Sequence, residues 1–303
     1  MREWTVIGVP TSAGAHNAGQ ERAPAALREA GLIERLREAG LSVADAGDLP
    51  GATFTTDHDH PSARNLAAVA RVARQVADAV AAVVADGRLP LVVGGDCTIT
   101  LGVIAGFRRS HPEVGLLYVD GDADLDTPDS ASSGIFDAMG AAHLLGRGAP
   151  ELTGLAGVPP LLEPYRLAMV GGDPREIDLA GRQFLANAGV SYQEGPALAA
   201  DPVGVARRAL DAVTARSEPL VVHLDVDVVD SGDLPLGNFP HYGSGVLLEH
   251  AVSCLGTLLA HESVAGLALT EVNPTHDGDG TPIQRYLDGL VRALTSPQDG
   301  RGA

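Results

Sequence analysis

Short apolar runs alternate with helix-like segments along the whole chain, and this alternation is what most constrains the fold. Apolar runs bounded by turn signals are typical of buried strands, whereas apolar residues at helical spacing indicate amphipathic helices. Strands are expected at residues 4–9, 41–44, 89–93, 114–119, 166–170, 190–193, 220–224 and 265–270. Helices are expected at residues 24–39, 65–85, 180–188, 202–215, 247–259 and 282–293.

Strands that are separated by helices form parallel sheets with both faces covered. The pattern therefore predicts an α/β fold in a single domain, a doubly wound and mostly parallel sheet of eight strands with helices on both faces. No repeat or linker divides the chain, so we expect this domain to span residues 1–296. Residues 297–303 are expected to form a disordered tail.

The chain is acidic, with a formal net charge of -18 over 303 residues. This charge disfavours nucleic acid and anionic membranes as partners and suits a small cationic substrate. No apolar run reaches the roughly 20 residues that a membrane span needs. A strand pattern starts at once, without a signal peptide, and Cys97 and Cys254 lie in no Cys-x-x-Cys motif. We therefore expect a cytoplasmic protein without disulfides or a membrane segment.

Two acidic motifs follow two of the predicted strands. Asp120-Gly121-Asp122-Ala123-Asp124 comes after the run 114–119, and Asp225-Val226-Asp227 comes after the run 220–224. Parallel strands end at one edge of a sheet, where α/β proteins place their sites. Five carboxylates in one crevice would repel each other unless one or two cations neutralise them. The alternative is a set of solvated loop aspartates, which we consider less consistent with two motifs on separate strands.

A third segment, Gly94-Gly95-Asp96-Cys97-Thr98, follows the run 89–93 and opens a predicted helix. Its glycines allow a tight turn and a close approach to a ligand. Cys97 is compatible with two interpretations, a small buried residue or a thiolate ligand at the start of a helix.

Taken together, these segments resemble the arginase and agmatinase (ureohydrolase) family. The resemblance rests on residues 94–97, 118–124, 133–134 and 224–230 and on Glu271-Val272-Asn273-Pro274, in the family's order and spacing. The segments 8–10 and 20–32 are similar to the family's opening, so the resemblance covers nearly the whole chain.

The resemblance implies a metal-dependent hydrolase that cleaves a C–N bond of a small guanidinium compound and releases urea or a substituted urea. Arginine, hydroxyarginine, agmatine and guanidino acids are the implied substrate types. Family members bind two manganese ions and commonly form trimers or hexamers. Carried over by position, Asp120 and Asp225 would bridge both metals, and Glu271 would accept the substrate guanidinium. Cys97 and Asp124 would complete the first metal site, and Asp122 and Asp227 the second.

The chain departs from the family at two of these ligands, because the family has histidine where this chain has Cys97 and Asp122. A thiolate suits zinc or iron better than manganese, so Zn or Fe are alternatives to Mn and the first site is in doubt. Cys97 also resembles a branch of the family that includes the hydroxyarginase acting on Nω-hydroxyarginine. A family descendant without a binuclear metal centre, acting as a binding or scaffold protein, is the alternative function.

A third departure is Asp137, which occupies the place of the family's proton-shuttle histidine. Its carboxyl group is either a catalytic proton relay or the N-cap of a helix over 138–145, and we favour the cap. Asp124, Asp137 and Glu271 are thus the candidate catalytic residues. His223 alternates with Asp225 toward the same crevice, although a core histidine bonded to backbone is the more common outcome.

Substrate recognition is assigned to residues near the predicted crevice. Asp126 and Ser133 match positions that contact the amino-acid end of the substrate in arginase-like enzymes. Asp126 is a carboxylate where arginase has an amide, which favours a substrate amine over a carboxylate. Glu176 and Asn238 lie in segments that are expected to face the ligand and the pocket mouth, and Glu271 is also expected to contact the substrate.

Overall fold

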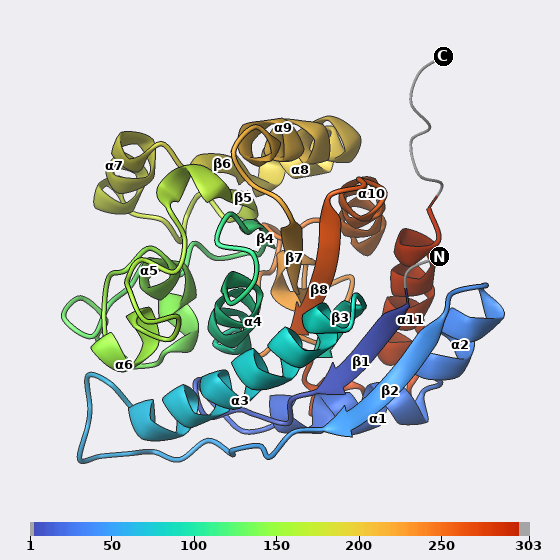
Figure 1. Cartoon of the computed structure of the whole chain (residues 1–303), viewed down its shortest axis with the longest axis horizontal. Coiled ribbons are helices and arrows are strands. Elements are labelled where there is room, and N and C mark those ends of the chain that lie inside the picture. Colours follow the sequence, from blue (N-terminus) through green and yellow to red (C-terminus); the bar gives the residue numbers. More distant parts are fainter. Residues whose placement is uncertain (1–2, 297–303) are drawn as a thin grey trace.

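The computed structural model describes residues 3–296, which form a single α/β domain around an eight-stranded, all-parallel sheet (Figure 1). The strand order across the sheet is β2-β1-β3-β8-β7-β4-β5-β6. The strands are β1 (Trp4–Gly8), β2 (Val43–Asp48), β3 (Leu89–Val93), β4 (Gly115–Val119), β5 (Leu167–Gly172), β6 (Ser191–Glu194), β7 (Leu220–Asp225) and β8 (Val264–Thr270). The predicted fold class is confirmed.

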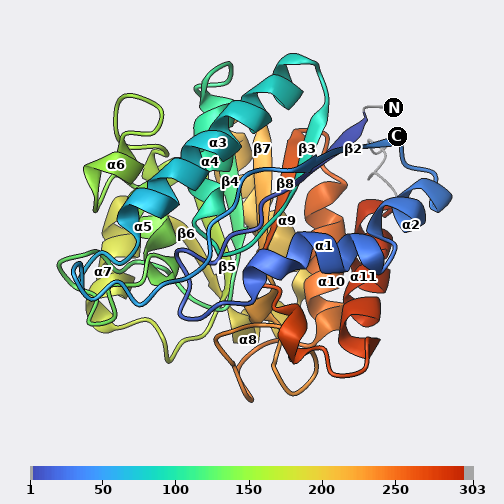
Figure 2. The ribbon, with the colours of Figure 1, turned by 90° about the horizontal axis from the view of Figure 1, so that it is seen from below.

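Helices cover both faces of the sheet (Figures 1 and 2). They are α1 (Ala23–Glu29), α2 (Leu32–Glu38), α3 (Leu66–Ala85), α4 (Ile99–Arg108), α5 (Gly140–Leu144), α6 (Pro150–Thr153), α7 (Leu179–Ala188), α8 (Gly195–Ala200), α9 (Pro202–Thr214), α10 (Leu248–Leu259) and α11 (Thr281–Leu294). Within residues 3–296, no helix is both long and apolar enough to cross a bilayer.

Two hydrophobic cores lie on opposite faces of the sheet, one beneath α3 to α6 and the other beneath α1, α2 and α8 to α11. Side chains of a strand alternate between the faces. On β7, Leu220, Val222 and Leu224 enter the second core, whereas Val221 enters the first. The same alternation places His223 and Asp225 on the face of Val221, toward α4.

Two segments differ from the sequence-based expectation. The single helix predicted over 24–39 is two helices, because Gly31 adopts a left-handed φ of 91° between α1 and α2. The strand predicted over 41–44 is the longer β2, which pairs with β1 at the edge of the sheet. Its residues after Val43 are largely exposed, so an apolar pattern could not define its end. The predicted tail 297–303 lies outside the described residues.

The sheet positions the site because β3, β8, β7 and β4 are neighbours in its centre. Their carboxyl ends bring together four segments that are far apart in the sequence. These are the loop before α4, the residue after β8, the end of β7 and the loop after β4.

The break at Gly31 gives a stability prediction. A Cβ at residue 31 would touch only the Arg35 side chain, 3.7 Å away, so Gly31→Ala isolates the cost of the left-handed backbone. We expect it to lower the free energy of unfolding by about 1–2 kcal/mol in urea titrations. Gly278→Ala is the matched control, because Gly278 has open space around it and no left-handed φ. Equal stability of the two variants would contradict the assigned strain.

Candidate metal centre and substrate cavity

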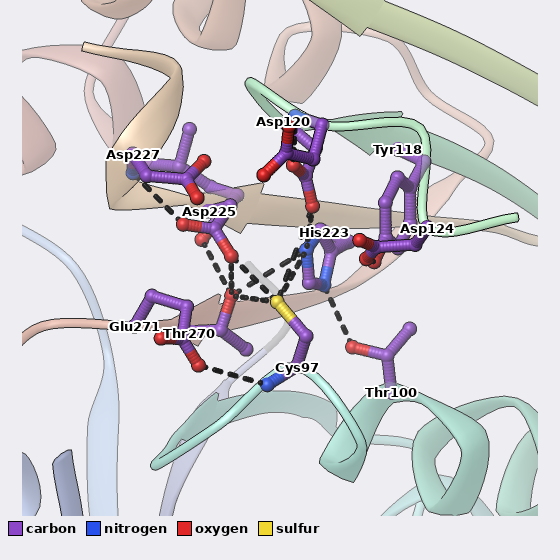
Figure 3. A network of polar contacts seen from close by, with 12 residues as sticks. Cys97, Thr100, Tyr118, Asp120, Asp124, His223, Asp225, Asp227, Thr270 and Glu271 are labelled. Carbon is purple, nitrogen blue, oxygen red and sulfur yellow. Dashed lines mark hydrogen bonds and ion pairs between the residues drawn. The ribbon is translucent and has the colours of Figure 1, made fainter. Parts of the chain in front are cut away.

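The first cluster of donor atoms surrounds the Cys97 thiol (Figure 3). Its Sγ lies 2.5 Å from Oδ2 of Asp225, 3.6 Å from Nε2 of His223 and 4.0 Å from Oδ2 of Asp120. One donor atom from each of these four buried residues fits within a common span of 4.8 Å. The structure thus brings together three residues predicted to share the first site and adds an imidazole to them.

His223 is fixed on three sides. Its Nδ1 lies 2.7 Å from the hydroxyl of Thr100, and its ring stacks on Tyr118 with centroids 4.0 Å apart and planes 4° from parallel. Tyr118 is its register partner on β4, and the small Ala268 is its partner on β8. Complete burial lowers the pKa of His223 to about 3, so the imidazole is neutral. The expected backbone-bonded histidine is wrong, because the ring contacts side chains and faces Cys97.

A second cluster consists of Asp122, Asp227 and His241. Nε2 of His241 lies 3.6 Å from Oδ2 of Asp122 and 3.9 Å from Oδ2 of Asp227. Its Nδ1 lies 3.6 Å from Oδ2 of Asp173, which ion-pairs with Arg175. Burial alone would lower the pKa of His241, but these three carboxylates raise it to about 9.

The two acidic motifs are folded by their own backbone. Oδ1 of Asp120 accepts a hydrogen bond from the Asp122 N–H at 2.7 Å, and Oδ1 of Asp225 accepts one from the Asp227 N–H at 2.8 Å. One oxygen of each residue is therefore committed to the loop, while Oδ2 is turned toward the Cys97 thiol. The local turns thus aim one oxygen of each aspartate into the crevice.

Asp124 is only 8% exposed and lies beside these clusters. Its Oδ2 accepts a hydrogen bond of 2.5 Å from the Tyr118 hydroxyl, and among the described residues Asp124 belongs to neither cluster. Its backbone has a left-handed φ of 47°. A non-glycine residue in this region costs free energy and is held there by its surroundings, as is common at functional sites.

Glu271 also has a left-handed φ, 63°, and is buried next to Cys97. Its Oε1 accepts a hydrogen bond from the Cys97 N–H at 3.2 Å, and its Oε2 accepts one from the Gln20 amide at 2.8 Å. The Asp137 carboxyl group bonds to Glu271 and accepts from the same Cys97 N–H at 3.0 Å. The favoured cap role of Asp137 is therefore wrong, because its side chain reaches across to another segment instead of capping its own helix.

Burial and mutual repulsion govern the charge state of these groups. Burial first, and then the neighbouring carboxylates, raise the pKa of Asp120, Asp124, Asp225 and Glu271 well above the ordinary values. The same two causes raise the pKa of the Cys97 thiol. Such a set is costly to ionise without a positive partner.

The donor chemistry fits divalent cations. Carboxylate oxygens, a thiol and two imidazoles are all metal ligands, and a bound cation holds such groups in their deprotonated forms. One atom also lacks a partner in the protein: Nε2 of the 2% exposed His241 makes no hydrogen bond with any described residue and faces two carboxylates. A bound cation would give this buried nitrogen the partner that the protein does not supply.

A cavity of about 630 Å³ opens beside the donor clusters. Asp126, Ser133 and Glu176 line it, as do Asp124 and Asp137 from the centre. Asn238 is not among the described residues that line this cavity; its side chain instead accepts a 2.6 Å hydrogen bond from Asn273. Sequence reasoning did not identify Arg147, which also lines the cavity and stacks over the ring of Phe184 with 4.3 Å to its centroid.

Two histidines of the centre were not assigned as ligands from the sequence. For His223 a signal existed, since it shares the parity of Asp225 on β7. No periodic signal pointed to His241, because it lies in an irregular segment between the 3₁₀ turn after β7 and α10.

Comparisons with known proteins show which family the chain is similar to. The arginase family model matches residues 2–287 of the chain. The chain is 30% identical to an arginase of Bacillus caldovelox over 282 residues, covering 91% of this chain and 93% of that protein. It is 30% identical to human arginase-1 over 294 residues, covering 94% and 89%. The structure of the Bacillus caldovelox arginase superposes with a TM-score of 0.88 at 28% identity, covering 97% of this chain and 98% of the other.

A family match over nearly the whole chain, relatives at this level of identity and a close structural superposition support one conclusion. The chain belongs to the arginase family.

Proposed function

We propose that the protein is a metal-dependent hydrolase that cleaves a C–N bond of a small guanidinium compound and releases urea or a substituted urea. The observation that carries this proposal is the convergence of metal-type donors with the buried carboxylate of Glu271 beside a cavity. Family membership supports the same reaction class.

The aspartates and Cys97 are proposed to hold two divalent cations. Asp120, which follows β4, and Asp225, at the end of β7, belong to the first cluster and are proposed to be ligands that both cations would share. Cys97 and Asp124 serve the first site, and Asp122 and Asp227 serve the second. When bound, such a pair of cations lowers the pKa of a water molecule and stabilises the charge that develops on its attack. Manganese is proposed from the family, with zinc or iron as alternatives that the thiol favours.

Glu271 is proposed to bind the substrate guanidinium. Its carboxylate lies within the crevice next to the first cluster, and a charge-assisted pair with a planar guanidinium fixes the orientation of the reacting carbon. Asp137 bonds to Glu271 and lines the cavity, and it is proposed to pass a proton to the leaving amine. Asp124 completes the proposed catalytic group.

The outer cavity is proposed to select the other end of the substrate. Asp126, Ser133 and Glu176 line the cavity, and their oxygen-bearing side chains favour a distal amine. Arg147 also lines the cavity, and its cation would pair with a carboxylate. We propose that Asn238 contacts the substrate at the mouth of the cavity, next to residues that line it. By resemblance to the family, the protein is proposed to act in the cytoplasm as a homo-oligomer, a trimer or hexamer.

A binding or scaffold protein without a binuclear centre is the alternative. The replacement of two expected histidine ligands by Cys97 and Asp122 favours it. Metal analysis separates the two functions: purified protein reconstituted with Mn, Zn or Fe that retains under about a tenth of an equivalent would exclude the hydrolase.

An activity assay tests the reaction directly. We expect metal-reconstituted protein to release urea or a substituted urea from at least one of arginine, hydroxyarginine, agmatine and guanidino acids. Glu271→Gln is expected to lower kcat/KM by about 100-fold or more, because a neutral amide replaces the charged acceptor. Glu249→Gln, on an exposed residue, is the control and should retain full activity. Equal activity of both variants would contradict the role of Glu271.

The preference for the distal group depends on Asp126. Because Asp126 is an exposed carboxylate at the cavity wall, Asp126→Asn should shift relative kcat/KM from amine-ended toward carboxylate-ended substrates by a few-fold up to about tenfold. Asp129→Asn, at a nearby exposed position outside the cavity lining, should leave the ratio unchanged. An unchanged ratio in both variants would remove Asp126 from substrate recognition.

If cations neutralise the carboxylates, removing one carboxylate charge should affect stability in opposite directions without and with metal. The parent should gain about 2.7 kcal/mol at a metal concentration 100 times the Kd. Asp120→Asn retains the Oδ1 that accepts from the Asp122 N–H but removes one buried charge. We expect this variant to be at least as stable as the parent in chelator, and less stable than the parent with metal, in thermal unfolding. A variant that is destabilised equally in both conditions would contradict the account.

A further inference from the structure

We infer that His223 and His241 are the imidazole ligands of the two cation sites, one in each site, so that the centre is built on nitrogen donors outside the acidic motifs. The inference rests on the proposed metal-dependent function for its cations. It assigns His223 to the site of Cys97 and His241 to the site of Asp122 and Asp227.

The first step concerns space around residue 97. The Cys97 sulfur already lies 3.6 Å from Nε2 of His223 and 3.4 Å from the hydroxyl of Thr270. An imidazole at position 97 would extend beyond the sulfur into the volume that the His223 ring occupies. A large ligand at 97 and a large ligand at 223 therefore exclude each other, and a short thiol at 97 leaves room for an imidazole from β7.

The second step concerns the orientation of His223. If Nδ1–H donates to the Thr100 hydroxyl at 2.7 Å, the lone pair of Nε2 is turned toward Cys97 and Asp120. This is the arrangement of a metal-binding histidine, whose other nitrogen is held by an oxygen atom. Stacking on Tyr118 fixes the ring plane (Figure 3). Thr100 is thus a positioning residue for this ligand.

The third step concerns His241, whose Nε2 has no hydrogen-bonding partner among residues 3–296. The nitrogen lies 3.6 Å from Asp122 and 3.9 Å from Asp227, which is beyond hydrogen-bonding distance. A Cβ at Gly121 would come within 2.9 Å of this nitrogen, so the absence of a side chain at residue 121 leaves the ring in place. The imidazole is aimed between two carboxylates that a cation would join.

The donor sets of the two sites differ in chemistry. The Cys97 thiolate and the His223 imidazole suit zinc or iron, whereas His241 with carboxylates also suits manganese. An imidazole binds a metal in its neutral form, so each of the two adds a ligand without adding to the negative charge of the carboxylates. The first site is therefore inferred to hold Zn²⁺ or Fe²⁺ more tightly than Mn²⁺.

Metal stoichiometry tests both ligands. Purified full-length protein is loaded with Zn²⁺, dialysed and measured by elemental analysis, and the parent is expected to retain two equivalents. His223→Ser and His241→Ser should each retain about one. His60→Ala is the control, because His60 is an exposed histidine in an acidic loop, and it should retain two.

Compensating swaps distinguish a ligand from a structural histidine. Cys97→His combined with His223→Ser, and Asp122→His combined with His241→Ser, move each imidazole across its site. Both double variants are expected to recover the second equivalent. Recovery also shows that a single variant lost metal for want of a ligand and not through misfolding, which circular dichroism checks independently.

A spectroscopic readout isolates the first site. Co²⁺-loaded parent is expected to show a thiolate-to-cobalt charge-transfer band in the near ultraviolet, and Cys97→Ser should lose it. Thr100→Val should weaken Co²⁺ affinity at this site by about 10–100-fold, whereas Thr100→Ser should retain it. X-ray absorption of the Co²⁺ parent should show imidazole scattering that decreases in His223→Ser and in His241→Ser.

Two equivalents of Zn²⁺ in both single histidine variants, or parent spectra without imidazole scattering, would overturn the inference. Fewer than two equivalents in the parent would also overturn it, since His241 would then act only as a counter-ion to its carboxylates. Failure of the proposed reaction is separate: the ligand pattern can hold in a protein that hydrolyses no guanidinium compound, and activity can persist while the histidine variants keep both metals.

Discussion

Repulsion among buried carboxylates is the interaction on which the rest of the site depends. Two unit charges 4 Å apart interact by about 4 kcal/mol at the effective dielectric constant of a protein surface, and more in a drier interior. Asp120, Asp225 and Glu271 are each no more than a few per cent exposed, and all three lie around the Cys97 thiol. Only protonation or bound cations can lower the electrostatic free energy of such a cluster enough for the protein to fold around it. The types of ligand present favour cations.

The sheet makes this crowding unavoidable. Because β3, β8, β7 and β4 are adjacent and parallel, the segments after them meet at one edge. The register that pairs Tyr118 with His223 also stacks their rings and directs the imidazole toward Cys97. Left-handed backbone at Asp124 and Glu271 shows that the loops accept strain to hold carboxylates in place. The order and register of the strands therefore determine the arrangement of the site.

The sequence predicted the features that depend on apolar periodicity and on the position of a residue in a strand. Apolar runs located the strands, and the aspartates after two of them were expected to converge because parallel strands share an edge. The break at Gly31 was missed because a helical apolar pattern continues across it. Asp137 was expected to cap its own helix, since local rules cannot detect a hydrogen bond to Cys97, 40 residues earlier.

The contacts of His223 and His241 could not be predicted from periodicity. Alternation placed His223 beside Asp225, but its contact with Cys97 depends on how the loop before α4 folds back over β7. His241 reaches Asp122 from an irregular segment, where no period relates residue number to direction. Motif comparison alone suggested a centre that had lost two ligands, whereas the structure places two imidazoles from different elements next to the remaining donor atoms.

A crystal structure of metal-loaded protein, with anomalous differences measured at the Mn, Fe and Zn edges, tests the central claim most directly. The account predicts two anomalous peaks within the carboxylate crevice, one bounded by Cys97 and His223 and the other by Asp122, Asp227 and His241. A crevice without an anomalous peak after loading with each metal, its carboxyl groups protonated and bonded to one another, would contradict it.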